Sequence, residues 1–87
     1  MYVIVVYDIE EKRVSKVCKF LRLYLNWIQN SVFEGNLTES ELKKIKKELK
    51  KIVHKDYDSI LIFRMKDKRY VDKEVIGIEK TELTNIF

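Results

Sequence analysis

The residue of this sequence best placed to do chemistry is Asp8, the first carboxylate of the chain. It follows an apolar run that contains four consecutive β-branched residues, Val3, Ile4, Val5 and Val6. Such a run predicts a strand covered on both faces and therefore central in a sheet. A polar side chain at the exit of a rigid central strand is held in place, which suits a binding or catalytic group. The alternative is that Asp8 only turns or caps the chain before the next helix.

A carboxylate in this position could hold a hard cation. Mg²⁺ commonly takes one or two carboxylates, and water and substrate phosphates complete its coordination. One Asp is a poor site, but a two-fold homodimer can bring the same residue from each copy to one axis. Two Asp8 side chains could then share a cation that relieves their mutual repulsion. The residues thus allow metal-assisted phosphodiester cleavage in a dimer.

Other residues offer weaker chemistry. Glu34 could be a second acid, although it stands where a strand-end turn residue is expected. Ser31 has no His or Lys partner at a recognisable spacing, so a nucleophilic serine is not supported. Tyr2 and Tyr7 could stack on bases, but the Lys/Arg-Gly-aromatic run of RNA-recognition sheets is absent, which favours core or rim positions. No glycine-rich phosphate loop is present.

The chain has one cysteine and one histidine. These counts exclude an internal disulfide and a His/Cys metal site within one chain. Cys18 falls at an apolar position of an expected helix and is interpreted as a small buried hydrophobe in a reducing cytoplasm. His54 falls at the C-terminal end of a second expected helix and is interpreted as structural.

Length and charge bound the class of protein. The 87 residues predict one domain, small enough that self-association would add useful burial. The net charge of +4 permits polyanion binding without requiring it. The N-terminal apolar run lacks a basic start, and no apolar stretch reaches membrane-spanning length. We therefore expect a soluble, cytoplasmic protein without a signal peptide.

The periodicity predicts a strand, a helix, two short strands, a helix and a strand. Glu10 and Glu11 precede the first helix and Asn26 ends it, which places Arg13 and Lys16 in its first turns and close to Asp8. Residues 27–29 and 32–34 read as strands, residues 38–54 as a helix and residues 59–65 as a second buried strand. This order predicts an α+β, ferredoxin-like βαββαβ domain with an antiparallel sheet and two helices on one face.

Two further features belong to the second half of the chain. Thr38 and Glu41 form a capping-box signature at the start of the second helix. Residues 75–78 read as a further strand in which Gly77 suggests a bulge or a close backbone approach. The chain then ends in the apolar residues Leu83, Ile86 and Phe87, for which the obvious dock is a second copy.

One face of the second helix is strongly basic. A charge run of this kind is usually a solvated helix face. If it binds phosphates, the binding would be blind to sequence and steeply dependent on salt. The lysines of this run are Lys43, Lys44, Lys46, Lys47, Lys50 and Lys51, interrupted by Glu48.

Two motifs carry a resemblance that covers almost the whole chain. Tyr7-Asp8-Ile9 and, further on, Gln29 to Gly35 (Gln-Asn-Ser-Val-Phe-Glu-Gly) are similar to those of the CRISPR-associated protein 2 family. The resemblance implies a ferredoxin-like homodimer of single-domain chains in which residues 80–87 or so pair with the partner subunit. It also implies that Asp8 is the catalytic and metal-linked aspartate, with Mg²⁺ as the usual ion and Mn²⁺ as its substitute.

The same resemblance suggests roles for other residues. Arg13, Lys16, Ser31 and Phe33 match positions linked in the family to activity or nucleic-acid contact. Trp27 is a departure, because many relatives carry a basic residue near this position. Some members are described as metal-dependent endonucleases on RNA or DNA, and others as scaffolds that bridge two integrase dimers and hold DNA.

Three hypotheses therefore stand for this sequence. The first is a metal-dependent endonuclease that acts on single-stranded RNA or double-stranded DNA through paired Asp8 residues. The second is a non-catalytic DNA-binding scaffold for spacer acquisition, which binds the integrase partner. The third, ranked below them, is a ferredoxin-like regulatory domain that binds a small ligand.

Overall fold

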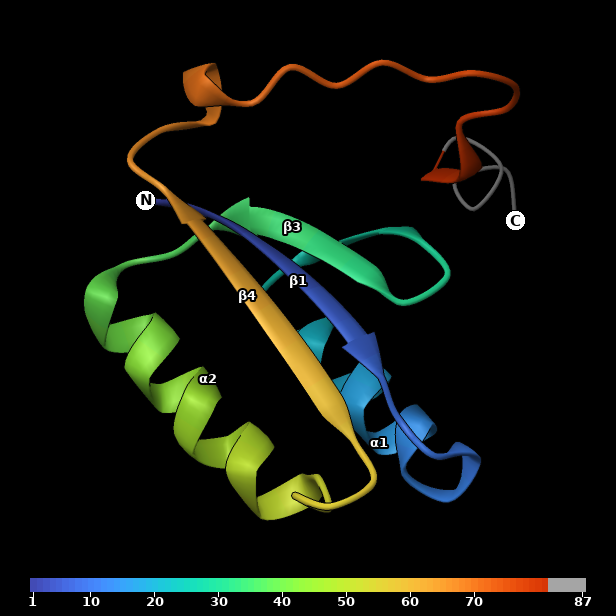
Figure 1. The fold of residues 1–87 in the computed structure, drawn as a ribbon. Helices are drawn as coiled ribbons and strands as arrows, with labels where there is room; N and C mark the ends of the chain where they lie inside the picture. Colours follow the sequence, from blue (N-terminus) through green and yellow to red (C-terminus); the bar gives the residue numbers. More distant parts are fainter. Residues whose placement is uncertain (82–87) are drawn as a thin grey trace.

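A computed structural model describes residues 1–81 of the chain and shows the predicted order of elements (Figure 1). The strands and helices alternate as strand, helix, two strands, helix and strand, which confirms the ferredoxin-like α+β prediction. The elements are β1 (Tyr2–Asp8), α1 (Glu11–Leu21), β2 (Asn26–Gln29), β3 (Val32–Asn36), α2 (Glu39–Ile52), β4 (Ser59–Met65) and the short 3-10 helix η1 (Lys68–Tyr70).

The sheet is antiparallel, with the strand order β2-β3-β1-β4. β1 lies between β3 and β4, so the prediction of a central first strand is confirmed. Val5 is the pivot of the register, because it pairs with Phe33 on one side and with Ile62 on the other. A β-branched run in this position gains packing partners on both neighbouring strands.

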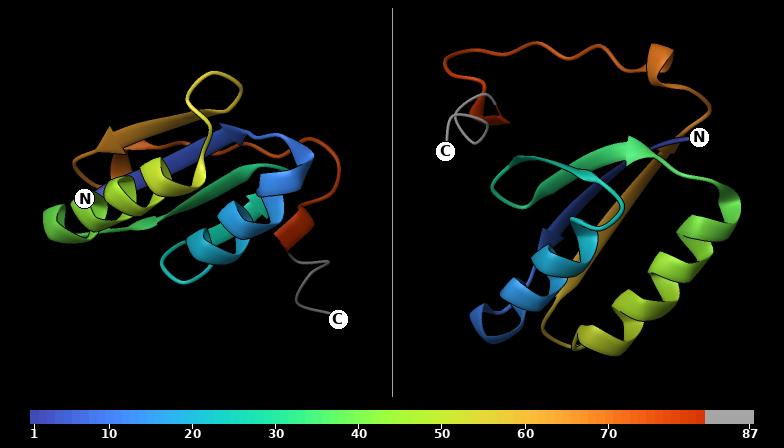
Figure 2. Two further views of the ribbon diagram at one scale, coloured as in Figure 1. Left: turned by 90° about the horizontal axis from the view of Figure 1, so that it is seen from below. Right: turned by 180° about the vertical axis from the view of Figure 1, so that it is seen from behind.

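Both helices cover the same face of the sheet (Figure 2). Val3, Val5 and Phe33 of the sheet point toward the helices and are fully buried. Val17 of α1 and Ile45 of α2 complete the core from the helix side. We call the opposite side the open face, because neither helix packs on it. Alternate strand residues point to opposite sides. The open face of the two long strands is formed by Ile4, Val6, Leu61 and Phe63.

α2 begins at the predicted capping box. The amide of Glu41 donates to Thr38 Oγ1 (3.1 Å), and the amide of Thr38 donates to Glu41 Oε1 (2.9 Å). These reciprocal bonds satisfy two amides that a helix start would otherwise leave without partners. They also lower the pKa of the Glu41 carboxyl. The helix then buries Leu42, Ile45 and Leu49, as its apolar stripe predicts.

The prediction that the first helix runs to Asn26 is wrong. α1 ends at Leu21, a turn follows, and Asn26 is already the first residue of β2, opposite Glu34. The apolar spacing continues past the helix because Leu25 is still buried in the core (5% exposed). Its amide also donates to the Leu21 carbonyl oxygen (2.9 Å), so the turn keeps a helix-like bond.

Residues 75–78 do not form the predicted strand. A strand needs a hydrogen-bonded neighbour, and the described part of the chain pairs no strand with this segment. Gly77 adopts a φ of 93°, which favours glycine. A Cβ added there would meet nothing within 4 Å, so the predicted close approach is also wrong. The predicted pairing of the tail, including Leu83, Ile86 and Phe87, lies outside the described residues.

Neither helix of the described region could cross a membrane. Both are too short and too polar for the hydrocarbon core of a bilayer.

Candidate active site

Asp8 stands at the C-terminal end of β1, where the chain leaves the sheet. It pairs in register with Ser59 of β4, and its side chain is exposed to solvent. Because side chains alternate along a strand, Asp8 lies on the open face, beyond Ile4 and Val6. The carboxylate therefore sits at the end of an apolar surface that no helix covers.

A second aspartate, Asp58, organises the turns next to this position. Its side chain is fully buried, and it accepts hydrogen bonds from the amides of Glu10 (2.9 Å) and His54 (2.8 Å). It also accepts two bonds from the Arg13 guanidinium, from Nε (2.6 Å) and from an Nη (3.0 Å). The Arg13 bonds, followed by those of the two amides, hold the Asp58 pKa well below its usual range.

These contacts join the β1–α1 connection, which follows Asp8, to the α2–β4 turn, which precedes its register partner Ser59. Glu10 lies two residues after Asp8, and Asp58 directly precedes Ser59, the register partner of Asp8. The sequence analysis assigned no role to Asp58. The signal it lacked was the pairing of Asp58 with Arg13, which are 45 positions apart.

The predicted cation beside Asp8 has other partners in the structure. The Arg13 guanidinium is 16% exposed and pairs with Asp58 and with Glu10 (2.8 Å). Its charge is thus committed to the structural link between the two turns. Lys16, the second predicted cation, is exposed on α1. Of the two, Lys16 is the one whose ammonium remains open to a phosphate.

Ser31 is brought to the same end of the sheet as Asp8. Its carbonyl oxygen accepts a hydrogen bond from the amide of Tyr7 (3.0 Å), the residue before Asp8. The Tyr7 ring points to the other side, where it stacks with Phe33 (centroids 6.2 Å apart). Burial, more than the neighbouring Cys18, raises the pKa of the Tyr7 hydroxyl. Tyr7 is thus a core residue, as the sequence favoured.

Phe33 does not reach the surface. It is 0% exposed and lies among the largest buried side chains of the core. Within one chain Phe33 thus supports the sheet from the core side, and its contact with nucleic acid stays a prediction. Trp27 is half-buried on β2, and its indole Nε1 donates to the Asn30 carbonyl oxygen (3.0 Å). The Trp27 ring therefore stabilises the β2–β3 turn, at the position where the sequence departs from the resemblance.

Glu34 is too far along the sheet to assist Asp8 within one chain. It pairs with Ile4, four positions before Asp8, which corresponds to about 13 Å of strand. Lys73 Nζ approaches the Glu34 carboxylate (3.9 Å). Burial and then Glu34 raise the pKa of the Tyr2 hydroxyl, so Tyr2 also belongs to the packed structure.

The donor set of one chain is small. Within residues 1–81, no group of three or more His, Cys, Asp or Glu side chains could hold a metal ion. Cys18 is half-buried on α1, and His54 stacks with Tyr57 (centroids 4.7 Å apart). An exposed carboxylate still fits a hard cation, and the other oxygen ligands would include water, substrate or groups beyond the described residues.

Known proteins identify the family of this arrangement. The family model for CRISPR associated protein Cas2 matches residues 1–73. The chain belongs to the Cas2 family. A Pyrococcus furiosus relative is 48% identical and one from Methanosarcina acetivorans 46%, each over 99% of both chains. Both are named "CRISPR-associated endoribonuclease Cas2".

Solved Cas2 structures share the fold. A crystal structure described as cas2 superposes with a TM-score of 0.85 at 49% identity and covers 92% of this chain and 90% of that chain. Streptococcus pyogenes Cas2, solved at pH 6.5, gives a TM-score of 0.76 at 34% identity and covers 88% of this chain and 100% of its own. The resemblance read from the two sequence motifs is thereby confirmed.

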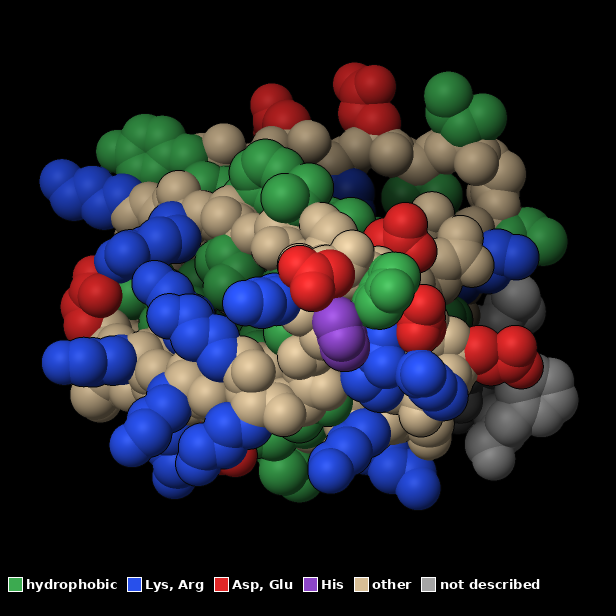
Figure 3. Space-filling view, turned by 60° about the horizontal axis from the view of Figure 1, so that its bottom comes forward, with side chains coloured by type: hydrophobic (Ala, Val, Ile, Leu, Met, Phe, Trp, Pro, Cys, Tyr) green, Lys and Arg blue, Asp and Glu red, His purple; other side chains and the backbone are tan. Residues whose placement is uncertain are grey.

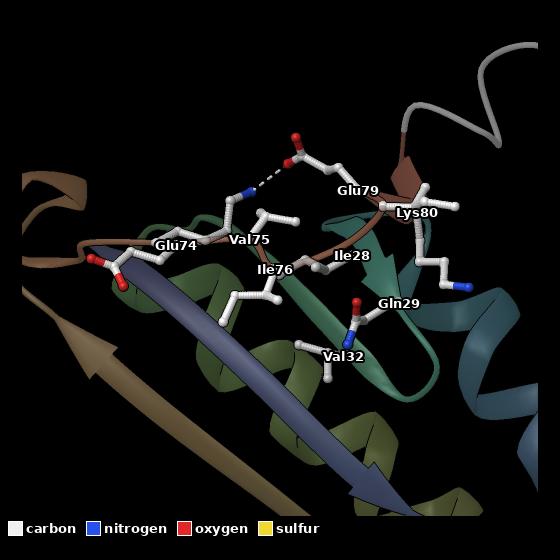
Figure 4. Close-up of a pocket in the computed structure, with 10 residues that line it drawn as sticks. Ile28, Gln29, Val32, Glu74, Val75, Ile76, Glu79 and Lys80 are labelled. Carbon is white, nitrogen blue, oxygen red and sulfur yellow. Dashed lines mark hydrogen bonds and ion pairs between the residues drawn. The ribbon is translucent and has the colours of Figure 1, made fainter.

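This Cas2-family chain also has a cavity that Asp8 does not line. It has a volume of about 290 Å³ and opens between the β2–β3 region and the segment of residues 73–80 (Figure 4). Ile28 and Val32 line it from the sheet, and Val75 and Ile76 line it from the segment. None of the predicted site residues takes part, so the cavity is not the candidate active site.

Proposed function

We propose that this chain is a metal-dependent endonuclease of the Cas2 family, which cuts RNA or DNA as a homodimer during spacer acquisition in CRISPR antiviral defence. The endoribonuclease names of its relatives support the nuclease activity. The observation that carries the proposal is the position of Asp8 at the end of an apolar sheet face on which neither helix packs. The expected place of action is the cytoplasm.

The open face supports the homodimer. Leu61 is 53% exposed and Phe63 is 52% exposed, and they pair in register with Val6 and Ile4. A contiguous exposed apolar surface of this kind marks an interface. The occupant we propose is a second copy, because an isologous interface would cover both open faces and place both Asp8 carboxylates at its rim.

The metal requirement follows from the donor count. One chain supplies the Asp8 carboxylate, and a dimer supplies two, which suits Mg²⁺ or Mn²⁺. When bound, the ion would polarise a phosphate oxygen and make a coordinated water more acidic. Asp8 would bind the ion, and the exposed Lys16 would attract the substrate backbone. Ser31 would help to fix the end of β1 through its bond to Tyr7.

The deciding experiment is Asp8→Asn, assayed for cleavage of single-stranded RNA and double-stranded DNA with Mg²⁺. We expect cleavage to fall by about 100-fold or more, because even changes in the second shell of a metal site cost 10–100-fold. Asp56→Asn is the matched control, since Asp56 is an exposed aspartate of the α2–β4 turn. Equal cleavage by parent, control and Asp8→Asn would show that the activity lies elsewhere.

The commitment of Arg13 to Asp58 favours a second candidate. The Arg13 guanidinium is bonded to Asp58, so it does not stand ready to hold a phosphate at Asp8. The second candidate is therefore a non-catalytic scaffold that binds double-stranded DNA and bridges dimers of the integrase partner. The same variant separates the two functions. If Asp8→Asn abolishes cleavage while spacer acquisition continues, the scaffold is the biological role. If spacer acquisition stops as well, nuclease activity is the biological role.

A further inference from the structure

The positive charge of this protein is concentrated on α2. Residues 43–51 contain six lysines and one glutamate, a net charge of +5, whereas the whole chain carries +4. The remaining residues therefore sum to a charge of −1. Figure 3 shows Lys and Arg side chains gathered on the side of the molecule where α2 lies. Residues 43–51 are therefore the densest concentration of positive charge in the sequence, and such a concentration attracts polyanions.

Most of these ammonium groups have no carboxylate partner. Lys51 pairs with Glu48 (3.2 Å), whereas the other five lysines of the run form no ion pair within residues 1–81. Lys47 has lysine neighbours at both i−4 and i+4, Lys43 and Lys51. Like charges at this spacing destabilise a helix. The helix forms in spite of the pattern, so a bound polyanion would remove a cost that the free protein carries.

The composition of the helix indicates which polyanion fits. Its apolar residues Leu42, Ile45 and Leu49 are 2%, 0% and 3% exposed, and Ile52 at its end packs partly against the core. The apolar side of the helix is therefore used within the fold and does not form a surface that could insert into a membrane. The helix also contains no aromatic residue. Proteins that bind single strands rely on aromatic stacking with the bases. A duplex, which presents phosphates and keeps its bases stacked, needs only the charges.

We propose that the outer face of α2, formed by Lys43, Lys47, Lys50 and Lys51, is a docking surface for the phosphate backbone of double-stranded nucleic acid. Lys43 to Lys50 covers about 10 Å of helix, long enough to face several phosphates of a duplex. α2 packs on the helix-covered side of the sheet (Figure 2). Asp8 follows Ile4 and Val6 at alternate positions of β1 and therefore lies on the open face. The surface therefore holds a duplex independently of cleavage at Asp8.

The test is a binding titration of full-length protein with a 30-base-pair DNA duplex of arbitrary sequence at several salt concentrations. The variant is Lys43→Gln/Lys47→Gln/Lys50→Gln. The control, Lys19→Gln/Lys66→Gln/Lys68→Gln, removes the same charge from exposed lysines elsewhere. We expect the α2 variant to raise the Kd about tenfold or more and to reduce the salt slope by about one per lysine, while the control has little effect.

Three further arms make the result specific. Circular dichroism should show unchanged helicity, since Gln and Lys have similar helix propensities. Lys43→Arg/Lys47→Arg/Lys50→Arg should keep binding, because it keeps the charges. Asp8→Asn should also keep binding. Equal weakening by the α2 variant and the control would overturn the proposal, as would an unchanged Kd. Tighter α2-dependent binding of single-stranded RNA or of an acidic protein would overturn the duplex assignment.

Discussion

The regions around Asp8 and Asp58 hold the same residue type at the same end of the sheet, Asp8 on β1 and Asp58 just before β4, yet in opposite states. The Asp58 side chain is fully buried and accepts bonds from two amides and one guanidinium. Asp8, paired in register with the next residue, Ser59, is exposed on the open face. A saturated buried carboxylate has no capacity left for a ligand. The difference separates the acid that holds the structure together from the acid available for chemistry.

The comparison also reassigns Arg13. A guanidinium on the first turns of α1 could serve either acid, and the structure gives it to Asp58 through two bonds. Paired geometry of this kind is what Arg offers and Lys does not. The region of Asp58 is therefore complete within one chain, whereas the region of Asp8 needs ligands from elsewhere.

The largest expected effect comes from removing the partner that the Asp8 region needs. Phe63→Glu places a carboxylate in the centre of the open face, and burying it in a dimer would be costly. We expect dimer dissociation to become about 100-fold more favourable, with cleavage lost in parallel. Light scattering reports the mass. Leu23→Glu is the control, because Leu23 is 74% exposed in the turn after α1. A Phe63→Glu protein that stays dimeric would contradict the proposed interface.

The next effect should separate the two acids by stability. Asp58→Asn removes the charge that pairs with Arg13, and we expect the Tm to fall by roughly 10 °C. Asp8→Asn should shift the Tm by only about 2 °C, because exposed positions contribute little. Thermal unfolding followed by circular dichroism measures both. Similar shifts for the two variants would break the distinction between them.

A smaller effect should come from Arg13→Lys. This change keeps the positive charge but loses the paired bonds to Asp58, and we expect a Tm lower by about 4–8 °C. Cleavage measured well below that Tm should stay within about twofold, in keeping with a structural residue. A large loss of cleavage in folded protein would instead assign Arg13 to the substrate.

The smallest effect is a dependence on pH. The pKa of Asp58 is lowered in the native state, so its contribution to stability is fully present above its unfolded pKa of about 4. The contribution is lost as the pH falls below that value toward the native pKa. The difference in unfolding free energy between parent and Asp58→Asn should be constant above about pH 5 and shrink below about pH 4. A difference that does not shrink by pH 2 would contradict this assignment.

Local patterns predicted the elements well. The β-branched run identified β1 as central, and Thr38 with Glu41 marked the start of α2. The predicted end of the first helix was wrong because the helical spacing of apolar residues continues beyond Leu21, where α1 ends, to the buried Leu25. Local patterns failed also at residues 75–78, where a β-rich composition finds no neighbouring strand in the described chain.

The sequence by itself determined the order of the elements and the place of Asp8 at the end of a rigid strand. Those properties follow from hydrophobic spacing and capping residues within a few positions of one another. Only the tertiary structure decided that Phe33 is buried, that Arg13 belongs to Asp58, and that Asp8 shares a face with exposed apolar residues. These outcomes depend on contacts between distant segments, which a local pattern does not encode.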